Sequence, residues 1–293
     1  MEKKLSSFLH DDNGCITIRK DRDKVILKVP ATISGGDTLF VKIYFFASLL
    51  SRLRNFLGEQ RGGIKDYHIC KNLESRGVPV PEPVGSYADG PLAGFARKSL
   101  FAAKWVDNAV SVRDFILQHF SRTQWPRKII LPPKRAWGAN DSIGADKFFL
   151  DQAGLWAFNF HLGAFVANVH NCGVYTDDLN SGNILVQLPI KSKPFFMLID
   201  YEGIGFKPAV PEKKCLSNLI QIAAFMSQVD EAAPRVLCRG YTQKNRRFDP
   251  EKITEIVEHR AKILQTVWLD RLNDNFEKIS RTLPGSKIKQ EKD

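Results

Sequence analysis

The N-terminal part of the chain is organised in short apolar runs separated by turn residues. The runs CITIRK (15–20), KVILKVP (24–30) and TLFVKIYF (38–45) are rich in Val, Ile, Leu and Phe, which is typical of strands. Gly35-Gly36-Asp37, between the second and third runs, favours a turn. Residues 94–106 repeat the strand pattern, so we predict a sheet in this part of the chain.

One predicted helix interrupts these strands. Residues 47–76 have a helical and basic pattern that ends at Arg76-Gly77, and glycine is favoured just after a helix because it accepts a left-handed backbone. Pro79 follows two residues later, where a helix cannot continue. The prolines of VPVPEPV (78–84) disfavour the α conformation at the residues before them. We therefore expect this segment to be extended.

The middle of the chain has two helical patterns with an insertion between them. Ser111 and Asp114 have the spacing of a capping box at the start of a helix over 111–120. A long apolar helix is predicted over 147–171. Residues 121–146 contain three prolines, two tryptophans and five basic residues. A segment of this length without periodicity is either functional or an ordinary solvated loop.

Two short strands and further helices complete the pattern. NILVQL (183–188) and FFMLID (195–200) are apolar runs joined by a turn that contains proline, lysine and serine. From residue 216 to about 275 the pattern is helical, with a break near 247–250. Residues 284–293 form a polar tail.

Composition and charge narrow the classes of protein that fit. Hydrophobic residues make up 43% of the 293 residues and charged residues 26%, which excludes a disordered chain and allows two domains or lobes. The formal net charge of +11 suits an anionic partner such as nucleic acid, lipid or a phosphorylated molecule. Because the basic residues are dispersed, nucleic acid is disfavoured. Five cysteines without a C-x-x-C pair indicate a reducing compartment and no zinc site.

Residues 152–169 are mostly apolar, carry no formal charge and are long enough to span a membrane. Gln152, Asn159, His161 and Asn168 interrupt this stretch, so we interpret it as a buried helix. The N-terminus has no apolar signal segment. A cytoplasmic location is therefore expected, with peripheral contact to the inner membrane as an extension of it.

Candidate chemistry lies around two of the strands. Asp178 and Asn183 are five residues apart in D-L-N-S-G-N, and Asp200 ends the next apolar run. Carboxylate and amide oxygens suit Mg²⁺ together with phosphate oxygens, and phosphoryl transfer also needs an acid that accepts the proton of the attacking hydroxyl. Lys42 lies inside the apolar run 38–45. It either pairs with nucleotide phosphates or is an edge-strand lysine whose ammonium reaches water.

The order of these motifs is similar to that of the protein-kinase-like superfamily: V-K-I, a helix, D-x-x-x-x-N and L-I-D-x-x-G. Within it, the chain resembles the bacterial lipopolysaccharide core kinases, which phosphorylate Kdo or heptose. The resembling runs are L-F-V-K-I-Y, R-G-V-P-V-P-E-P, V-H-N-C-G-V-Y-T-D-D-L-N-S-G-N-I-L-V, M-L-I-D-Y-E-G and R-V-L-C-R-G-Y, within residues 38–241. The resemblance implies an α+β, bilobal protein-kinase-like fold. An antiparallel sheet lobe (1–106) would precede a mainly helical lobe (107–293).

The resemblance also implies an activity. It is ATP- and Mg²⁺-dependent transfer of the γ-phosphoryl group to a hydroxyl of a lipopolysaccharide inner-core sugar. Asp178 corresponds to the catalytic base, Asn183 and Asp200 to the metal-binding residues, and Lys42 to the lysine that holds ATP phosphates. The implied partners are a lipid-linked sugar and an anionic membrane surface, without nucleic acid.

Two further parts of the nucleotide site follow from the resemblance. A helical acid should pair with the strand lysine, and counting back from Gly77 gives Asp66, with Glu59 as the alternative. The segment 101–107 corresponds to the hinge that reads adenine with its backbone. The hinge residues assigned to the nucleotide are Lys104, Trp105 and Val106.

The chain departs from the family pattern at three places. Thr176 stands where the family usually has His, and Asp177 stands in place of Arg, which makes Asp177 a rival for Asp178. The spacing to Asn183 favours Asp178. No G-x-G-x-x-G lies near 13–29. A kinase for another small molecule or a protein, or an inactive pseudokinase scaffold, therefore stays as an alternative.

Two residues near these motifs are expected to have ordinary roles. His170 is predicted to pack and hydrogen-bond within the helical lobe. Glu202, two residues after Asp200, could aid the metal site, but we expect it to face solvent.

Overall fold

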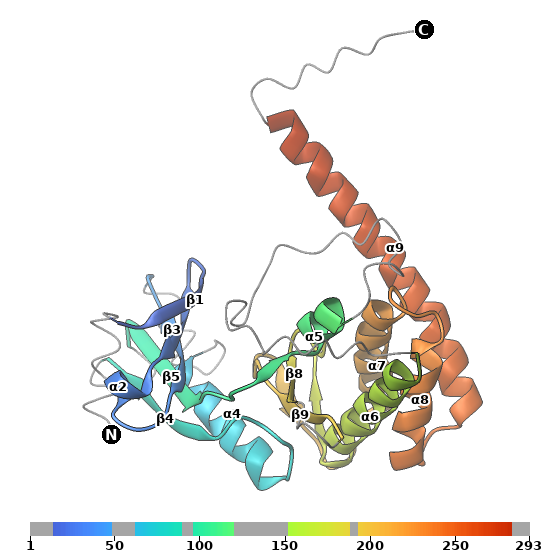
Figure 1. Cartoon of the computed structure of the whole chain (residues 1–293), viewed down its shortest axis with the longest axis horizontal. Coiled ribbons are helices and arrows are strands. Elements are labelled where there is room, and N and C mark those ends of the chain that lie inside the picture. The colour runs from blue at the N-terminus through green and yellow to red at the C-terminus, as the bar shows by residue number, and fades with distance from the viewer. Residues whose placement is uncertain (1–13, 49–61, 90–95, 120–151, 188–192, 283–293) are drawn as a thin grey trace, which may run out of the picture.

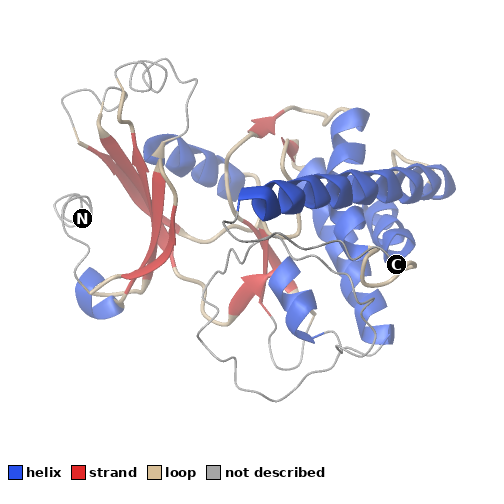
Figure 2. Cartoon of the chain, turned by 90° about the horizontal axis from the view of Figure 1, so that it is seen from above, coloured by secondary structure: helices blue, strands red, loops and turns tan. Residues whose placement is uncertain are grey.

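A five-stranded antiparallel sheet forms the N-terminal part of the molecule (Figures 1 and 2). The computed structural model describes residues 14–48, 62–89, 96–119, 152–187 and 193–282. The strands lie in the order β1-β2-β3-β5-β4. Their bounds are Ile16–Lys20 (β1), Lys24–Val29 (β2), Leu39–Phe45 (β3), Pro83–Ala88 (β4) and Lys98–Lys104 (β5), with the short helix α2 (Ala31–Ser34) between β2 and β3.

The sheet contains the predicted strands and one further strand, β4, that the sequence pattern did not predict. The runs 15–20, 24–30 and 38–45 become β1, β2 and β3, as predicted. The segment 94–106 contributes a single strand, β5, over its described residues. The extended segment 78–84 leads into β4, which continues to Ala88 and pairs with β5. Its prolines hid this strand because proline lacks the amide that a sheet needs.

Helix α4 (Gly63–Ser75) lies against the sheet and is the described part of the predicted helix 47–76. A Cβ on Gly63 would lie 2.0 Å from the backbone carbon of Leu100, so only glycine lets the helix approach β5 this closely. Its last turn is followed by Gly77, whose φ of 76° is the left-handed conformation predicted there. Residues 49–61, the rest of that prediction, lie outside the described residues.

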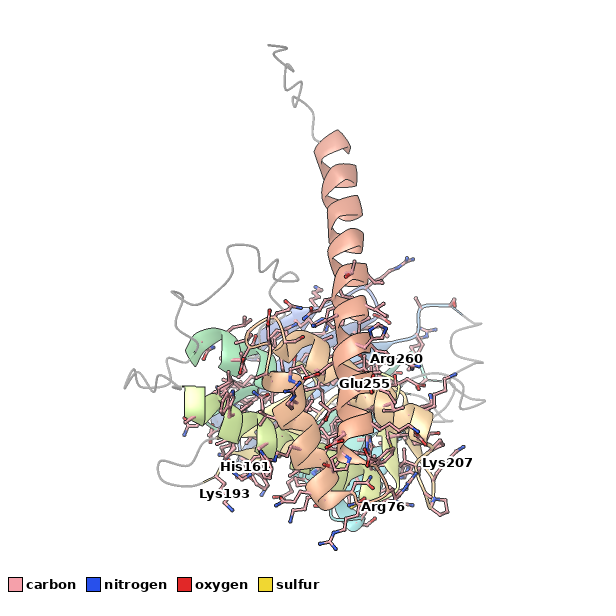
Figure 3. All side chains as sticks on the ribbon, turned by 90° about the vertical axis from the view of Figure 1, so that its right-hand side faces the viewer. Arg76, His161, Lys193, Lys207, Glu255 and Arg260 are labelled. Carbon is pink, nitrogen blue, oxygen red and sulfur yellow. The ribbon has the colours of Figure 1, made fainter. Side chains whose placement is uncertain are left out.

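The C-terminal end of α4 contacts the helical part of the molecule. The Arg76 guanidinium donates a hydrogen bond of 3.1 Å to the backbone oxygen of Cys172 and lies 4.9 Å from the ring centroid of Phe206. Figure 3 shows Arg76 on the face of the molecule that α9 crosses. The helix is thereby fixed at both ends relative to the strands that carry the candidate site.

The described C-terminal part is mainly helical, with short strand pairs. The strands form a three-stranded sheet, β6-β8-β9, and a two-stranded sheet, β10-β7. The helix bounds are Val112–His119 (α5), Gln152–Asn171 (α6), Glu212–Met226 (α7), Ala233–Lys244 (α8) and Pro250–Thr282 (α9). The strand bounds are Ala109–Ser111 (β6), Val174–Thr176 (β7), Ile184–Gln187 (β8), Phe195–Leu198 (β9) and Ile204–Phe206 (β10).

The helical predictions hold with two corrections. The Ser111 cap is confirmed, because the Asp114 backbone N–H donates to Ser111 Oγ at 3.0 Å. The stretch 216–275 is broken at 227–232 as well as near 247–250, and α7 begins already at Glu212. The additional break precedes Pro234, which fits the first turn of a new helix better than a helix interior.

Helices α6 and α8 cross at very short range through two glycines. A Cβ on Gly163 would lie 2.0 Å from the Leu237 oxygen, and one on Gly240 would lie 1.9 Å from the Phe160 oxygen. We call the packed pair α6 and α8 the helix platform; its member α6 also contacts β7. Among the described residues no helix is long and apolar enough to cross a membrane, which includes the stretch 152–169. The insertion 121–146 and the tail 284–293 lie outside the described residues.

Candidate active site

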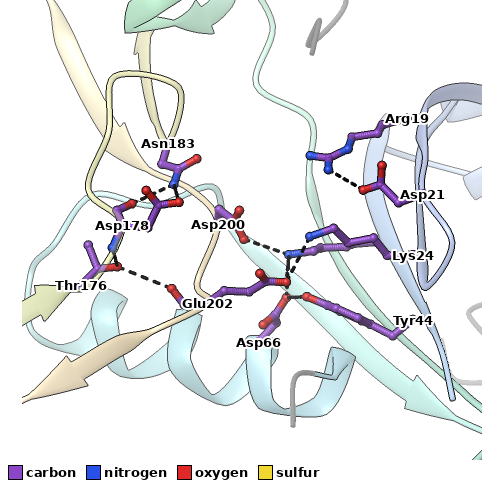
Figure 4. A network of polar contacts seen from close by, with 11 residues as sticks. Arg19, Asp21, Lys24, Tyr44, Asp66, Thr176, Asp178, Asn183, Asp200 and Glu202 are labelled. Atoms are coloured by element: carbon purple, nitrogen blue, oxygen red, sulfur yellow. Dashed lines mark hydrogen bonds and ion pairs between the residues drawn. The ribbon is translucent and has the colours of Figure 1, made fainter. Parts of the chain in front are cut away.

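Lys42 is the centre of a buried ionic cluster. Its side chain is 6% exposed, and its Nζ lies 3.0 Å from Asp200 Oδ1, 3.5 Å from Asp66 Oδ2 and 3.6 Å from Glu202 Oε1 (Figure 4). Burial alone lowers the pKa of a lysine because the ammonium loses its hydration. The three carboxylates outweigh this effect, and the pKa of Lys42 is raised. Lys42 is therefore a charged residue facing acids and is not an edge-strand lysine directed to water.

Asp66 on α4 is bound from two sides. The Tyr44 hydroxyl donates a 2.6 Å hydrogen bond to Asp66 Oδ2, the oxygen that also faces Lys42. Burial raises the pKa of Asp66 although Lys42 and Tyr44 act to lower it. Of the two acids considered as partners of Lys42, the structure brings Asp66 to it, and Glu59 lies outside the described residues. Tyr44 was not foreseen, although its position two residues after Lys42 put it on the same face of the strand.

The expectation that Glu202 faces solvent is wrong. Its side chain is 10% exposed, and Oε1 lies 3.2 Å from Lys24 Nζ as well as 3.6 Å from Lys42 Nζ. The register of β2 and β3 pairs Ile26 with Lys42 and Lys24 with Tyr44, so the two lysines project from the same face of the sheet. No local signal could predict this contact, because Lys24 and Glu202 are 178 residues apart.

Asp178 and Asn183 are joined by hydrogen bonds within their loop. Asn183 Nδ2 donates to the Asp178 backbone oxygen at 2.8 Å and to Asp178 Oδ2 at 3.3 Å. Asn180 Nδ2 donates to Asp178 Oδ1 at 2.7 Å. Because the amide nitrogen of Asn183 faces Asp178, its amide oxygen is directed away from that carboxylate (Figure 4). The loop therefore presents an exposed carboxylate beside an outward-facing amide oxygen.

The neighbouring Asp177 is directed to a different element. Its carboxylate forms an ion pair with Lys214 on α7, and its backbone oxygen accepts a 2.9 Å hydrogen bond from Gln221. The two rival acids are thus separated: Asp178 contacts Asn183, and Asp177 contacts α7.

Asp200 lies between the two groups of residues (Figure 4). Its φ of 61° is in the left-handed region, which residues other than glycine seldom adopt. Its neighbours hold this conformation, because Ile199 and Tyr201 are buried and the Ile199 N–H donates to the Asn183 backbone oxygen at 3.0 Å. Strained backbone of this kind occurs preferentially at functional sites.

The donor set near Asp200 suits a small hard cation bound together with phosphate. No three His, Cys, Asp or Glu side chains of the described part of the chain are grouped so as to hold a metal ion by themselves. Mg²⁺ is commonly held by one or two protein oxygens and by substrate phosphates. The Asp200 carboxylate, which is 34% exposed, and the Asn183 amide oxygen fit that requirement.

A buried hydrogen-bond chain supports the strand before Asp178. His170 Nδ1 lies 2.9 Å from the Tyr241 hydroxyl, and His170 Nε2 lies 3.1 Å from Asn218 Oδ1. Asn218 Nδ2 in turn donates to the Thr176 backbone oxygen at 2.6 Å. An amide oxygen only accepts, so His170 is protonated on Nε2 and accepts from Tyr241 on Nδ1. The predicted structural role of His170 is confirmed, and burial lowers its pKa to about 4.

Known proteins were compared with the chain at three levels. No protein-family model matches it, and no curated protein matches it. Among solved structures, WaaP in complex with acyl carrier protein matches with a TM-score of 0.54 and 16% identity, over 85% of this chain and 88% of that one. The chain has a protein-kinase-like fold. The BubR1 kinase domain also matches, with a TM-score of 0.44 and 12% identity over 73% of this chain and 60% of that one.

The kinase-like fold confirms the predicted α+β class, with an N-terminal antiparallel sheet and a mainly helical C-terminal part. It also agrees with the motif order from which the sequence resemblance was drawn. At this level of identity the likeness concerns the fold, so the roles of individual residues rest on their geometry.

In the segment expected to be the hinge, at the end of β5, two backbone amides are already hydrogen-bonded. The Lys104 N–H donates to the Glu82 oxygen at 2.8 Å, and the Trp105 N–H donates to the Thr38 oxygen at 2.9 Å. The Lys104 ammonium pairs with Glu82 at 3.0 Å. Val106 packs against the small apolar cluster of Leu185, Met197 and Ile199.

Proposed function

We propose that this protein is an ATP- and Mg²⁺-dependent kinase that phosphorylates a hydroxyl of a lipopolysaccharide inner-core sugar, Kdo or heptose. The observation that carries the catalytic part is the 3.0 Å contact between Lys42 and Asp200 within a kinase-like fold. In such a fold a strand lysine and an acid after the catalytic loop hold the nucleotide phosphates and their metal.

Each residue of the cluster has a task in this proposal. Lys42 binds phosphate oxygens of ATP, and Asp66 keeps its ammonium in place. Asn183 and Asp200 hold Mg²⁺, which when bound neutralises charge that develops on the phosphates. The Asp178 carboxylate orients the acceptor hydroxyl and takes its proton as the new P–O bond forms. The bond between the γ-phosphorus and the bridging oxygen breaks, and ADP leaves.

The adenine is assigned to the segment that follows β5. The N–H groups of Lys104 and Trp105 donate within the sheet region, so of the three residues expected there Val106 is our choice for an amide that reads adenine. Its contact with an apolar cluster offers the apolar surface on which a base can lie. The lobes 1–106 and 107–293 would thus form one catalytic unit.

The acceptor is proposed from the sequence resemblance and from charge. A formal net charge of +11 suits a lipid-linked, phosphorylated sugar at an anionic membrane surface. We accordingly place the protein in the cytoplasm, at the inner face of the membrane. A kinase for another small molecule or a protein is the second candidate, favoured by the exposed position of Asp178, which a larger acceptor could also reach.

Transfer of labelled phosphate from ATP tests this proposal, with Kdo-lipid A, heptosylated core and a generic protein as parallel acceptors. Wild type should label a core sugar, and Asp178→Asn should reduce the rate by at least roughly a hundredfold. Asp177→Asn is the matched control, because its carboxylate pairs with Lys214, and it should retain activity. Equal rates for wild type and Asp178→Asn would refute the catalytic assignment. Labelling of protein alone would refute the sugar acceptor.

A further inference from the structure

The hairpin above the candidate phosphate site has no glycine-rich loop. In protein kinases such a loop covers the phosphates, and backbone N–H groups in glycine-rich turns can bind anions. Here Arg22 and Asp23 occupy a tight turn between β1 and β2, and the Asp21 N–H donates to the Lys24 oxygen at 2.8 Å. The two turn residues are not glycine, and the Asp21 amide before them is used to close the hairpin. Another group is needed to face the phosphates from this strand pair.

Lys24 is the first residue after that turn, and its side chain is directed into the cluster. Its Nζ lies 3.2 Å from Glu202 Oε1, and the side chain is 12% exposed. The same oxygen lies 3.6 Å from Lys42 Nζ. Two ammonium groups, one from β2 and one from β3, therefore stand within 3.6 Å of one carboxylate oxygen. Figure 4 shows the Lys24 side chain directed toward Glu202.

Two neighbouring ammonium groups repel each other in a partly buried site. Glu202 offsets this repulsion because its carboxylate faces both groups, and Lys42 also contacts Asp200, the residue assigned to the metal. Lysine binds phosphate as a compact point charge. A pair of lysines converging from two strands can contact two phosphates of one nucleotide.

We propose that Lys24 is a second phosphate-binding lysine, which takes the place of the glycine-rich loop, and that Glu202 is the residue that positions it. This inference rests on the proposed ATP-dependent activity and extends it. Lys42 contacts the phosphates from β3, while Lys24 contacts them from β2. Affinity for the nucleotide then depends on side-chain charge in the hairpin and not on backbone amides.

Titration calorimetry with ATP, ADP and adenosine tests the proposal on wild type, Lys24→Met and Lys20→Met. Lys20→Met is the matched control, because it removes the same charge from the same hairpin at an exposed position. Lys24→Met should weaken the binding of ATP and ADP by roughly tenfold to a hundredfold, the range for a hydrogen bond to a charged group. Its binding of adenosine should match that of wild type. Lys24→Arg keeps the charge and should retain most of the affinity.

The possible results separate this inference from the proposed function. A wild-type affinity for ATP in folded Lys24→Met would overturn the role of Lys24 while leaving the kinase proposal intact. An equal loss of ATP and adenosine binding would overturn it too, because the Lys24–Glu202 pair would then only support the structure. If the wild-type protein binds no ATP, both proposals fail together. Circular dichroism of each variant establishes that it is folded before titration.

Discussion

Replacing His170 with glutamine should make the stability of the protein less sensitive to mildly acid pH. Burial holds the pKa of His170 at about 4, compared with its ordinary value of 6.5. As pH falls below 6.5 the unfolded chain binds a proton at this residue, and the folded protein does not until pH approaches 4. The stability contributed by the neutral ring is therefore present above pH 6.5 and is lost as pH falls.

The size of the effect follows from the same two values. The full difference corresponds to roughly 3 kcal/mol, and about 1 kcal/mol of it is lost between pH 7.5 and 5.5. Glutamine does not titrate, yet it can still donate to Asn218 and accept from Tyr241. Whatever its stability at pH 7.5, the variant should lose about 1 kcal/mol less stability than wild type over this pH interval.

Urea unfolding at pH 7.5 and 5.5 measures this difference. Subtracting the loss of stability of the variant from that of wild type cancels the contribution of groups that titrate in both proteins. His259→Gln is the control, because His259 is exposed on α9 and water hydrates its ring before and after unfolding. The same decline in wild type and His170→Gln would refute the reasoning, since it would mean that the folded protein accepts a proton at His170 as readily as the unfolded chain.

Two other substitutions probe the helix platform and the ionic cluster. Gly240→Ala should destabilise the protein by about 1–3 kcal/mol or more, because its Cβ would lie 1.9 Å from the Phe160 oxygen. Thermal unfolding compares this variant with Gly36→Ala, whose Cβ has open space. Equal melting temperatures of the two variants would contradict the close crossing of α6 and α8. Tyr44→Phe removes the hydroxyl that donates to Asp66 and should cost about 1.5–3 kcal/mol. Unfolding in urea tests this value, and a loss below about 0.5 kcal/mol would contradict a bond to an ionised carboxylate.

The sequence predicted those parts of the site that depend on short stretches of chain. Asp178 and Asn183 share one loop whose hydrogen bonds span five residues, so their spacing already indicated their proximity. The strand around Lys42 was predictable because a buried strand needs an apolar run. The assignments of catalytic and metal-binding roles to these residues stay predictions.

Contacts between distant segments could not be predicted in the same way. Glu202 has the composition of a surface acid, and its burial follows from a lysine that the register of β2 and β3 brings to it. Strand β4 was obscured by prolines that a strand at the edge of the sheet tolerates. Both predictions failed because contacts between distant segments determined the structure, while the local sequence pattern favoured a solvent-facing acid and a segment without strand pairing.

The left-handed backbone at Asp200 restricts which residues can stand there. Its φ of 61° is tolerated by aspartate and asparagine but disfavours residues with bulkier or branched side chains. Alanine at this position would combine loss of the carboxylate with added backbone strain, so a loss of activity would have two causes. Asparagine changes the charge alone. Among residues that carry a side chain, this backbone favours an acid or its amide, and glycine is the other residue that it accepts. A single substitution from aspartate to asparagine could therefore turn a metal-holding residue into a neutral one while the fold stays intact.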